Sequence, residues 1–280
     1  MAIIVQISSG LGNQMFQYAS AYAVAKKNKQ KLILDPNFIF DERKYQLQDF
    51  SLDVTRTLLT SHLTQRKITN GHVLKLVNAL KKASIRHYPI YSEKKQFEYD
   101  EQLMNINSPM YLQGYWQSWK YFAEVRDDIR RQFTYRKQLS KRAEDLVKSI
   151  SQENSVALHI RRTDYKTILN GACLSMDYYS KAIKLIQEKE KDCKFYLFTD
   201  EKESADLSQL PLKMQIVDGV TDEEEFVIMQ KCRHHIIANS TFSWWAAYLA
   251  GEGIVVAPVV GMWKRDFYLN EWHTINTYFE

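Results

Sequence analysis

The second half of the chain alternates short apolar runs with segments whose apolar residues recur at helical spacing. The apolar runs are rich in β-branched and aromatic side chains and are bounded by polar turns, which is typical of buried strands. We expect five such strands, at residues 156–160, 195–198, 214–217, 235–238 and 254–257, the last being the final strand. Helical crossovers between strands make the strands parallel. The alternation therefore predicts a doubly wound α/β sheet.

The helical segments carry signals of their own. Thr221 and Glu224 have the spacing of a capping box, which predicts a helix over residues 222–231. Another helix is predicted over 240–250. An apolar stripe at helical spacing predicts a further one, and its members are Tyr179, Ala182, Ile183 and Ile186.

The chain opens with a strand, a glycine turn and a helix. Residues 2–7 predict a buried strand, and the turn that follows contains Gly10, Gly12 and Asn13, the last a good helix N-cap. Glycines let backbone amides approach a ligand, so this turn can hold a phosphate or a sugar hydroxyl. Phe16 stands near the place of the third glycine of a dinucleotide fingerprint. That residue disfavours a nicotinamide site.

A length of 280 residues favours two domains. A strand at 31–35 completes the first βαβ unit, and the region 37–100 is interpreted as irregular and helical, with its lysine pairs on a solvated face. Helices are expected at 121–133 and 140–150. The polar residues that follow indicate a boundary near 135–154, and we divide the domains after residue 145.

Two adjacent arginines, Arg161 and Arg162, come directly after the predicted strand that ends with His159 and Ile160. Ligands of open α/β sheets collect beyond the carboxyl ends of the strands, and a guanidinium binds phosphate or carboxylate through paired hydrogen bonds. We interpret this loop as an anion site. The alternative is that both arginines form salt bridges with neighbouring acids.

A second anion-binding element is predicted at the turn that begins with Asn239. Asn239 or Ser240 can cap the helix, whose first free amides, together with the hydroxyls of Ser240 and Thr241, would face a ligand at the sheet edge. A plain N-cap is the alternative. Trp244 and Trp245 are expected to pack in the core.

Aromatic residues are dense between Tyr111 and Phe122, around Gly114. Aromatic rings with polar tips suit sugar rings as well as protein interiors, and core packing is the commoner use.

Composition excludes several classes of protein. The formal charge of +5 is compatible with an anionic substrate but is too small to indicate nucleic-acid binding. The three cysteines lack CxxC spacing, and no Walker A, HExxH or Asp-x-Asp signature occurs, so we expect neither a disulfide framework nor a metal. The apolar opening run lacks a basic flank and stops at Ser8, which favours a cytoplasmic protein with at most peripheral membrane contact. No feature specifies an oligomeric state.

Several segments resemble, in order, those of the bacterial α-1,2-fucosyltransferases of glycosyltransferase family 11. They are Ser9–Ala19, Gly114–Phe122, His159–Tyr165, Phe198–Asp200 and Asn239–Trp245. The resemblance implies a GT-B architecture, in which two Rossmann-like domains face a central cleft. Residues 1–145 would form the N-terminal, mainly acceptor-side domain, and residues 146–280 the C-terminal domain that binds GDP-fucose.

The resemblance also implies a reaction. L-Fucose would be transferred with inversion from GDP-β-L-fucose to the 2-hydroxyl of a terminal β-galactoside, without a metal or other cofactor. The expected partners are GDP-fucose and a β-galactoside oligosaccharide, and the expected product is an α-1,2-fucosylated bacterial glycan such as an O-antigen.

The sequence departs from the family pattern at three places. Ser9 stands where glycine is usual, Thr163 replaces a glycine of the arginine motif, and Thr199-Asp200-Glu201 stands where Ser-Asp-Asp is common. Thr163 also occurs in the related α-1,6-fucosyltransferases. The alternatives are therefore an α-1,6- or protein O-fucosyltransferase, or a catalytically inactive nucleotide-sugar-binding protein.

Roles follow from the resemblance and from residue chemistry. A metal-free enzyme needs fixed donors aimed at the departing diphosphate, and Arg161 is the first choice. Asp164 would orient Arg161 or the donor, Arg162 would reach the phosphates through the loop or hold Asp164, and Asp200 would contact guanine or ribose. The catalytic set is Arg161, Asn13 and Asp164. The donor-binding set is Gly10, Gly12, His159, Arg162, Asp200, Asn239, Ser240, Thr241 and Phe242. The acceptor-binding set is Tyr115, Trp116 and Gln117.

No side chain in these sets is a convincing general base. The two arginines should keep Asp164 ionised, which makes it a poor proton acceptor. We hypothesise that proton transfer comes late in a cation-like transition state and falls to a positioned side chain or a water.

Overall fold

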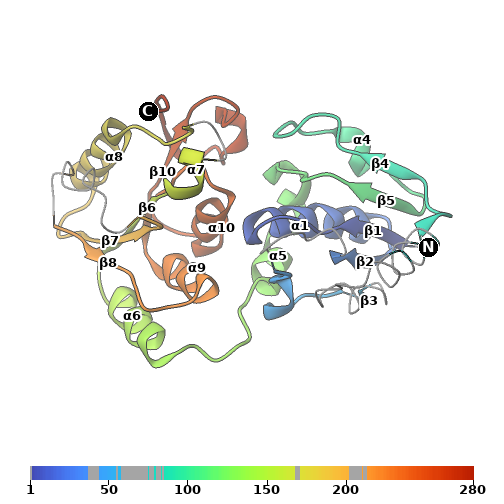
Figure 1. The fold of residues 1–280 in the computed structure, drawn as a ribbon, viewed down its shortest axis with the longest axis horizontal. Coiled ribbons are helices and arrows are strands. Elements are labelled where there is room, and N and C mark those ends of the chain that lie inside the picture. The colour runs from blue at the N-terminus through green and yellow to red at the C-terminus, as the bar shows by residue number, and fades with distance from the viewer. Residues whose placement is uncertain are drawn as a thin grey trace. The chain divides into compact units, whose positions relative to one another are not determined.

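The computed structural model describes residues 2–36, 44–54, 56–57, 75, 79, 83, 85–167, 171–201, 210 and 213–280. The chain divides into two compact units, Met1–Arg136 and Lys137–Glu280. Each unit is built on its own parallel sheet (Figure 1). Much of the region 37–100, expected to be irregular and helical, lies outside the described residues, including 37–43 and 58–74.

The sheet of the first unit has the strand order β3-β2-β1-β5-β4, and all of its described pairings are parallel. Its strands are β1 (Ala2–Gln6), β2 (Lys31–Asp35), β3 (Arg56–Thr57), β4 (Ile90–Ser92) and β5 (Met110–Gln113). β1 lies in the centre and is buried because its apolar side chains meet protein on both faces. The strands expected at 2–7 and 31–35 are confirmed.

The helices of the first unit are α1 (Leu11–Lys27), α4 (Glu101–Met104) and α5 (Arg126–Gln132), with 3-10 turns η2 (Leu47–Asp49) and η3 (Trp119–Val125). The expectation of one continuous helix over 121–133 is wrong. Phe122 has non-helical dihedral angles of φ −116° and ψ 17°, and its ring is fully buried. Anchoring this ring in the core interrupts the helix, so α5 starts afresh at Arg126.

The sheet of the second unit has the order β11-β10-β9-β6-β7-β8, again with parallel pairings throughout the described strands. Its strands are β6 (Ser155–Ile160), β7 (Lys194–Thr199), β8 (Gln215–Ile216), β9 (His234–Ile236), β10 (Val255–Val259) and β11 (His273–Asn276). Every residue of the central strand β6 is buried. The five expected strands are present, with ends that shift by at most two residues.

The helices of the second unit are α6 (Lys141–Ser151), α7 (Thr163–Thr167), α8 (Met176–Lys189), α9 (Asp222–Lys231) and α10 (Thr241–Ala250), with a 3-10 turn η5 (Arg265–Phe267). α8 covers one face of the sheet, and α9 and α10 cover the other (Figure 1). The capping box of α9 is confirmed: the Thr221 amide donates to Glu224 at 3.0 Å and the Glu224 amide donates to the Thr221 hydroxyl at 3.3 Å. The expected stripe of α8 is buried.

The division between the units falls after Arg136, within the expected region 135–154 but before residue 145. Residue 145 lies inside α6, which is amphipathic and buries Ala143, Leu146 and Ile150. The Ser140 amide at its start donates to the Glu224 carboxylate of α9 at 2.5 Å. α6 therefore belongs to the second unit, because its apolar face and its first turn are held there.

Four strands were not anticipated, β3, β4, β5 and β11, and the expectation that the strand at 254–257 is the last is wrong. β4 and β11 lie at sheet edges and show mostly intermediate or exposed residues, so they lack a continuous apolar run. β5 is short and falls inside the aromatic stretch, where the aromatic pattern obscured the strand.

In each sheet the chain adds strands first on one side of the first strand and then on the other. The point where the order reverses is a topological switch point, where ligands commonly bind. In the second sheet the chain builds β6, β7 and β8 to one side and then returns to place β9 on the other side of β6. In the first sheet the reversal lies between β1 and β5. In open α/β sheets, ligands bind beyond the carboxyl ends of the two strands at such a switch point.

Candidate active site

The switch point of the second sheet gathers most of the predicted donor-binding residues. β6 pairs with β7 so that Ile160 stands opposite Thr199, and β6 pairs with β9 on its other side. Because these strands are parallel, their carboxyl ends lie at the same edge of the sheet. The loop after β6, which carries Arg161, therefore lies between Asp200 and the turn at Asn239.

Asp200 holds the backbone of the arginine loop. Its Oδ1 accepts a hydrogen bond from the Arg162 amide at 2.9 Å, and its Oδ2 accepts one from the Thr163 amide at 3.2 Å. The Thr163 hydroxyl donates to the Asp200 carbonyl oxygen at 3.1 Å. Asp200 was predicted to contact guanine or ribose. In the structure, both of its carboxylate oxygens support the loop that presents Arg161 and Arg162.

Arg162 follows the salt-bridge alternative. Its guanidinium is buried, lies 3.5 Å from the Glu201 carboxylate and 3.9 Å from the Glu280 carboxylate, and its Nη1 meets the Met176 sulfur at 3.8 Å. The carboxylates compensate for the cost of burying a cation. We therefore assign Arg162 to the support of the loop, in place of the predicted phosphate contact.

Glu280 belongs to a segment that pairs with the chain after the arginine loop. Leu174 and Phe279 form an antiparallel bridge, and the Glu280 amide donates to the Cys173 carbonyl oxygen at 2.9 Å. The Glu280 side chain accepts from the Met176 amide at 3.1 Å, where α8 begins. One residue thus meets both Arg162 and the first turn of α8.

Arg161 is only partly buried, and its guanidinium carbon lies 5.3 Å from the centre of the Tyr165 ring. A cation over an aromatic face is attracted by the ring's negative potential. The Tyr165 hydroxyl donates to the Asn239 carbonyl oxygen at 2.7 Å. Tyr165 therefore links the arginine loop to the turn before α10. Asp164 also lies in α7, but its side chain is outside the described part of the structure.

At the start of α10, the cap is Ser240, one of the two residues that the sequence left open. Its hydroxyl accepts from the Phe242 amide at 3.3 Å, and Thr241 is the first helical residue. The Asn239 side chain is buried and donates instead to the Ala172 carbonyl oxygen at 3.1 Å. Its Oδ1 accepts no hydrogen bond within the described residues.

His159 and Phe242 pack against each other, with ring centres 6.1 Å apart. Phe242 also meets Phe226 of α9 at 5.2 Å. His159 is 6 % exposed and Phe242 is half-buried, so the two rings join the end of β6 to the start of α10. Trp244 and Trp245 are fully buried, as expected.

The switch point of the first sheet holds the glycine turn. Gly10 is the N-cap of α1, and Gly12 and Asn13 lie in its first turn, so the expectation that Asn13 caps the helix is wrong. Ser9 is in the left-handed region with φ 66°, and the helix begins three residues earlier than a cap at Asn13 would place it. The Asn13 side chain donates to the Ser9 hydroxyl at 2.9 Å.

The loop after β5, Gly114–Gln117, is called the aromatic turn. Gln117 Nε2 donates to Asn13 Oδ1 at 2.9 Å, so the predicted acceptor and catalytic residues of this unit do come together. Tyr115 is partly exposed, whereas Trp116 is fully buried against Tyr91. A buried indole presents no face to a sugar, and we assign Trp116 to the core rather than to acceptor contact.

Polar side chains of α1 that the sequence reasoning missed tie the surrounding loops to this helix. Gln17 is 1 % exposed, and its Nε2 donates to the Gly114 carbonyl oxygen at 3.1 Å. Gln14 is fully buried, and its Nε2 donates to the carbonyl oxygens of Ser9 and Lys44, both at 2.8 Å. The signal available was the helical spacing of two glutamines next to the glycine turn.

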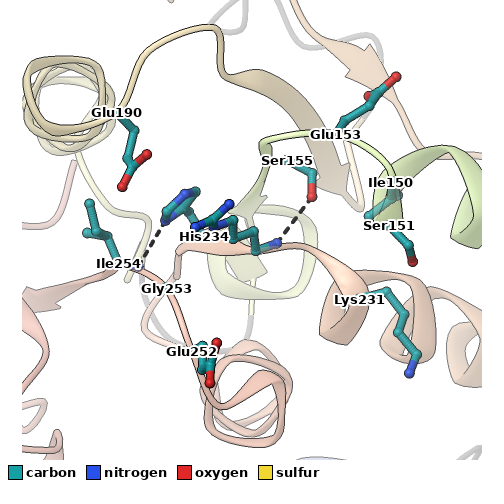
Figure 2. A pocket seen from close by; sticks show the side chains of 11 residues that line it. Ile150, Ser151, Glu153, Ser155, Glu190, Lys231, His234, Glu252, Gly253 and Ile254 are labelled. Carbon is teal, nitrogen blue, oxygen red and sulfur yellow. Dashed lines mark hydrogen bonds between the residues drawn. The ribbon is translucent and has the colours of Figure 1, made fainter.

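A pocket of about 370 Å³ lies at the opposite edge of the second sheet, where β6 and β9 begin. Figure 2 shows His234 in this pocket, with its Nδ1 accepting from the Ile254 amide at 2.9 Å. His234 Nε2 donates to Asn154 at 3.0 Å. Both ring nitrogens of His234 thus form hydrogen bonds within the protein, one with the Ile254 amide and the other with the Asn154 side chain. This pocket is separate from the switch point.

Two features are absent from the part of the chain that the structure describes. No group of three or more histidine, cysteine, aspartate or glutamate side chains there is arranged to hold a metal ion. No described helix has the length and apolar character needed to cross a membrane.

The fold and the site define a parallel α/β protein with an arginine loop and a helix start at one switch point. The chain belongs to glycosyl transferase family 11, whose family model matches residues 2–276. It is 30% identical over 275 residues to the alpha-1,2-colitosyltransferase of Escherichia coli, covering 91% of each chain. It is 25% identical to galactoside alpha-(1,2)-fucosyltransferase 2 of Sus scrofa, covering 94% of this chain and 76% of the relative.

Solved structures agree on the fold. The alpha-1,6-fucosyltransferase NodZ soaked with GDP-fucose, an enzyme from Bradyrhizobium, superposes with a TM-score of 0.53 at 14% identity. That match covers 89% of this chain and 92% of NodZ. At this identity the likeness concerns the fold alone.

Proposed function

We propose that this chain transfers L-fucose from GDP-β-L-fucose to the 2-hydroxyl of a terminal β-galactoside, with inversion at the sugar carbon. The observation that carries the proposal is family membership over residues 2–276, together with relatives named as α-1,2-transferases. The two units would correspond to the two domains of a GT-B enzyme, with GDP-fucose bound mainly by the second and the galactoside mainly by the first.

The second unit supplies what the departing diphosphate requires. Negative charge develops on the diphosphate as its bond to fucose breaks, and fixed cationic or amide donors stabilise that charge. In our proposal, Arg161 and the first amides of α10 are those donors, because both lie at the switch point of the second sheet. Asp200 and Tyr165 keep them in place. No metal takes part in this scheme.

The first unit supplies the contacts to the acceptor. Asn13 and Gln117 are joined across the switch point of the first sheet, and Tyr115 is a partly exposed ring beside them. Amide side chains donate to and accept from sugar hydroxyls, and an aromatic face packs on the apolar side of a galactose ring. We propose these three residues as the galactoside contacts, and for Asn13 this role takes the place of the catalytic one expected from the sequence.

A second candidate function is α-1,2-colitosyl transfer, favoured by the 30% identity to the Escherichia coli colitosyltransferase. Colitose is fucose without the 3-hydroxyl. A site built to hydrogen-bond that hydroxyl rejects the deoxy sugar by about four orders of magnitude, whereas a site without such a bond tolerates both sugars. Donor choice therefore separates the two candidates.

The test is to incubate the protein with GDP-fucose or GDP-colitose, in EDTA, with lactose, N-acetyllactosamine and lacto-N-biose, and to determine linkage by NMR. An α-1,2-fucosylated galactoside formed in EDTA is the expected result. Preference for GDP-colitose would support the second candidate. An α-1,6 product, or GDP-fucose binding without transfer to any acceptor, would overturn the proposal, and loss of activity in EDTA would overturn its metal-free scheme.

A further inference from the structure

Glu93 lies directly after β4, at the carboxyl edge of the first sheet, and no motif singles it out. Its Oε2 accepts a hydrogen bond from the Tyr115 amide at 2.8 Å, and its Oε1 accepts one from the Trp116 amide at 2.9 Å. The Glu93 amide donates to the Gln113 carbonyl oxygen at 2.8 Å. A single residue therefore holds the aromatic turn and the end of β5 together.

The aromatic turn is shaped around this carboxylate. A Cβ atom at Gly114 would lie 2.4 Å from the Glu93 Cβ, so only glycine fits there. Trp116 is in the left-handed region with φ 56°, an unfavourable conformation for a bulky side chain. The hydrogen bonds from two consecutive amides to one carboxylate offset that strain.

The aromatic turn thereby positions the proposed acceptor residues. Gln117 ends the turn, and its Nε2 donates to Asn13 Oδ1 at 2.9 Å. Asn13 in turn donates to the Ser9 hydroxyl at 2.9 Å. The contacts thus run without a break from Glu93 through the turn to Gln117 and then to Asn13.

Burial disfavours the charged form of the Glu93 carboxyl group. Burial raises the pKa of its carboxyl above the ordinary value, while hydrogen bonds from the amides of Tyr115, Trp116 and Gln117 act in the opposite direction. A carboxylate in such a place is stabilised only by the groups that it binds. Those groups are the amides of the aromatic turn.

We propose that Glu93 is a positioning residue that fixes Gln117 and Asn13 by folding the aromatic turn, and through them orients the acceptor sugar. The last step rests on the proposed function. Glu93 itself is not aimed at a substrate, since both of its oxygens bind the turn.

The main variant is Glu93→Gln, with Glu98→Gln as its matched control. The Gln side chain keeps the length but turns an NH2 group toward one of the two amides. Loss of a hydrogen bond to a charged group predicts an acceptor KM raised about 10- to 100-fold. We expect kcat and the donor KM to stay within about threefold. Glu98 is near in sequence, with a side chain 58% exposed and paired with Lys95 at 3.4 Å, and its substitution should change nothing.

Two further variants separate positioning from simple loss of structure. Glu93→Asp keeps the charge but shortens the side chain, so its acceptor KM should fall between those of wild type and Glu93→Gln. Gln117→Met removes the Nε2 donor and should raise the acceptor KM in the same way. If Glu93 acts through Gln117, adding Glu93→Gln to Gln117→Met should raise the acceptor KM no further.

An NMR measurement tests the geometry without any substrate. The side-chain amide signal of Gln117, assigned by its loss in Gln117→Met, should be a single pair in wild type and should shift or broaden in Glu93→Gln. An unchanged signal, or a fall in kcat with an unchanged acceptor KM, would overturn the positioning role. If wild type transfers neither sugar to any galactoside, the proposed function fails instead, and the Gln117 signal still decides the role of Glu93.

Discussion

The carboxylate of Asp200, at the end of β7, accepts a hydrogen bond at 2.9 Å from the backbone amide of Arg162, just after β6. Its second oxygen accepts a hydrogen bond from the next amide, that of Thr163, at 3.2 Å. The position of the arginine loop is therefore set by the neighbouring strand as well as by its own. The loop carries Arg161, so the geometry of the proposed donor site depends on Asp200.

We predict that Asp200→Asn weakens donor use. Asparagine offers one acceptor oxygen and turns an NH2 group toward the second amide, so one of the two hydrogen bonds is lost. The KM for GDP-fucose should rise about tenfold, and the free energy of unfolding should fall by about 1 kcal/mol. Asp192→Asn is the control, because Asp192 is exposed and has φ 55°, a conformation that asparagine tolerates. Equal donor KM values for the two variants would contradict the prediction.

Arg161→Lys should retain binding but lose rate. Lysine keeps the positive charge without the planar fork that places two donors on a phosphate. Loss of one preorganised donor typically lowers kcat by about 10²- to 10³-fold, measured with saturating GDP-fucose and lactose. Arg142→Lys serves as the control, since Arg142 is half exposed and pairs with Asp218 at 3.1 Å. A kcat within threefold of wild type would remove Arg161 from the catalytic step.

Glu280→Gln should lower stability more than a surface ion pair can account for. The substitution removes one of two carboxylates near the buried Arg162, while the amide oxygen can still accept from the Met176 amide. We expect a loss of about 1 kcal/mol in urea-induced unfolding. Glu188→Gln, which breaks an exposed helical pair with Lys184, should cost less than about 0.5 kcal/mol. Similar losses in both variants would mean that Glu280 contributes little to holding Arg162.

Stability should fall below about pH 6.5 in a way that depends on His235. This side chain is fully buried, and burial lowers its pKa from 6.5 to about 4 while its Nε2 donates to the Met229 carbonyl oxygen at 2.9 Å. Below pH 6.5 the unfolded chain binds a proton that the folded chain does not, so the stabilising contribution is complete above pH 6.5 and is lost down to about pH 4. The loss is on the order of 3 kcal/mol.

His235→Gln keeps a donor for Met229 but does not titrate. Its free energy of unfolding should therefore change less than that of wild type between pH 7.5 and pH 5. Parallel curves over this range would show that His235 makes no contribution to the acid sensitivity.

The elements that the sequence predicted well are those whose signals are local. The buried strand β6 shows as an apolar run, and the capping box of α9 depends on two residues that are three positions apart. Trp244 and Trp245 were correctly expected in the core because large aromatic rings are seldom left in solvent. The edge strand β11 was missed because a strand with one free side needs no continuous apolar run.

The site was only partly predictable, because its supports are distant in sequence. The residues at strand ends, Arg161 and Asp200, follow from the rule that parallel strands present ligands at their carboxyl edge. Glu93 binds a turn more than 20 residues away, and Gln17 reaches Gly114 across 97 positions. Hydrogen bonds of this kind depend on the folded arrangement. The sequence around one partner therefore does not indicate which distant residue the other partner is.

Tyr165 contacts Arg161 with its ring and the Asn239 carbonyl with its hydroxyl, so one side chain couples the position of the arginine loop to that of the turn before α10. A homologue that replaces the tyrosine by phenylalanine keeps the ring but frees the turn before α10. Because the acceptor is a backbone carbonyl, any residue at position 239 can supply it, so the constraint falls on the hydroxyl at position 165, 74 positions away in the chain.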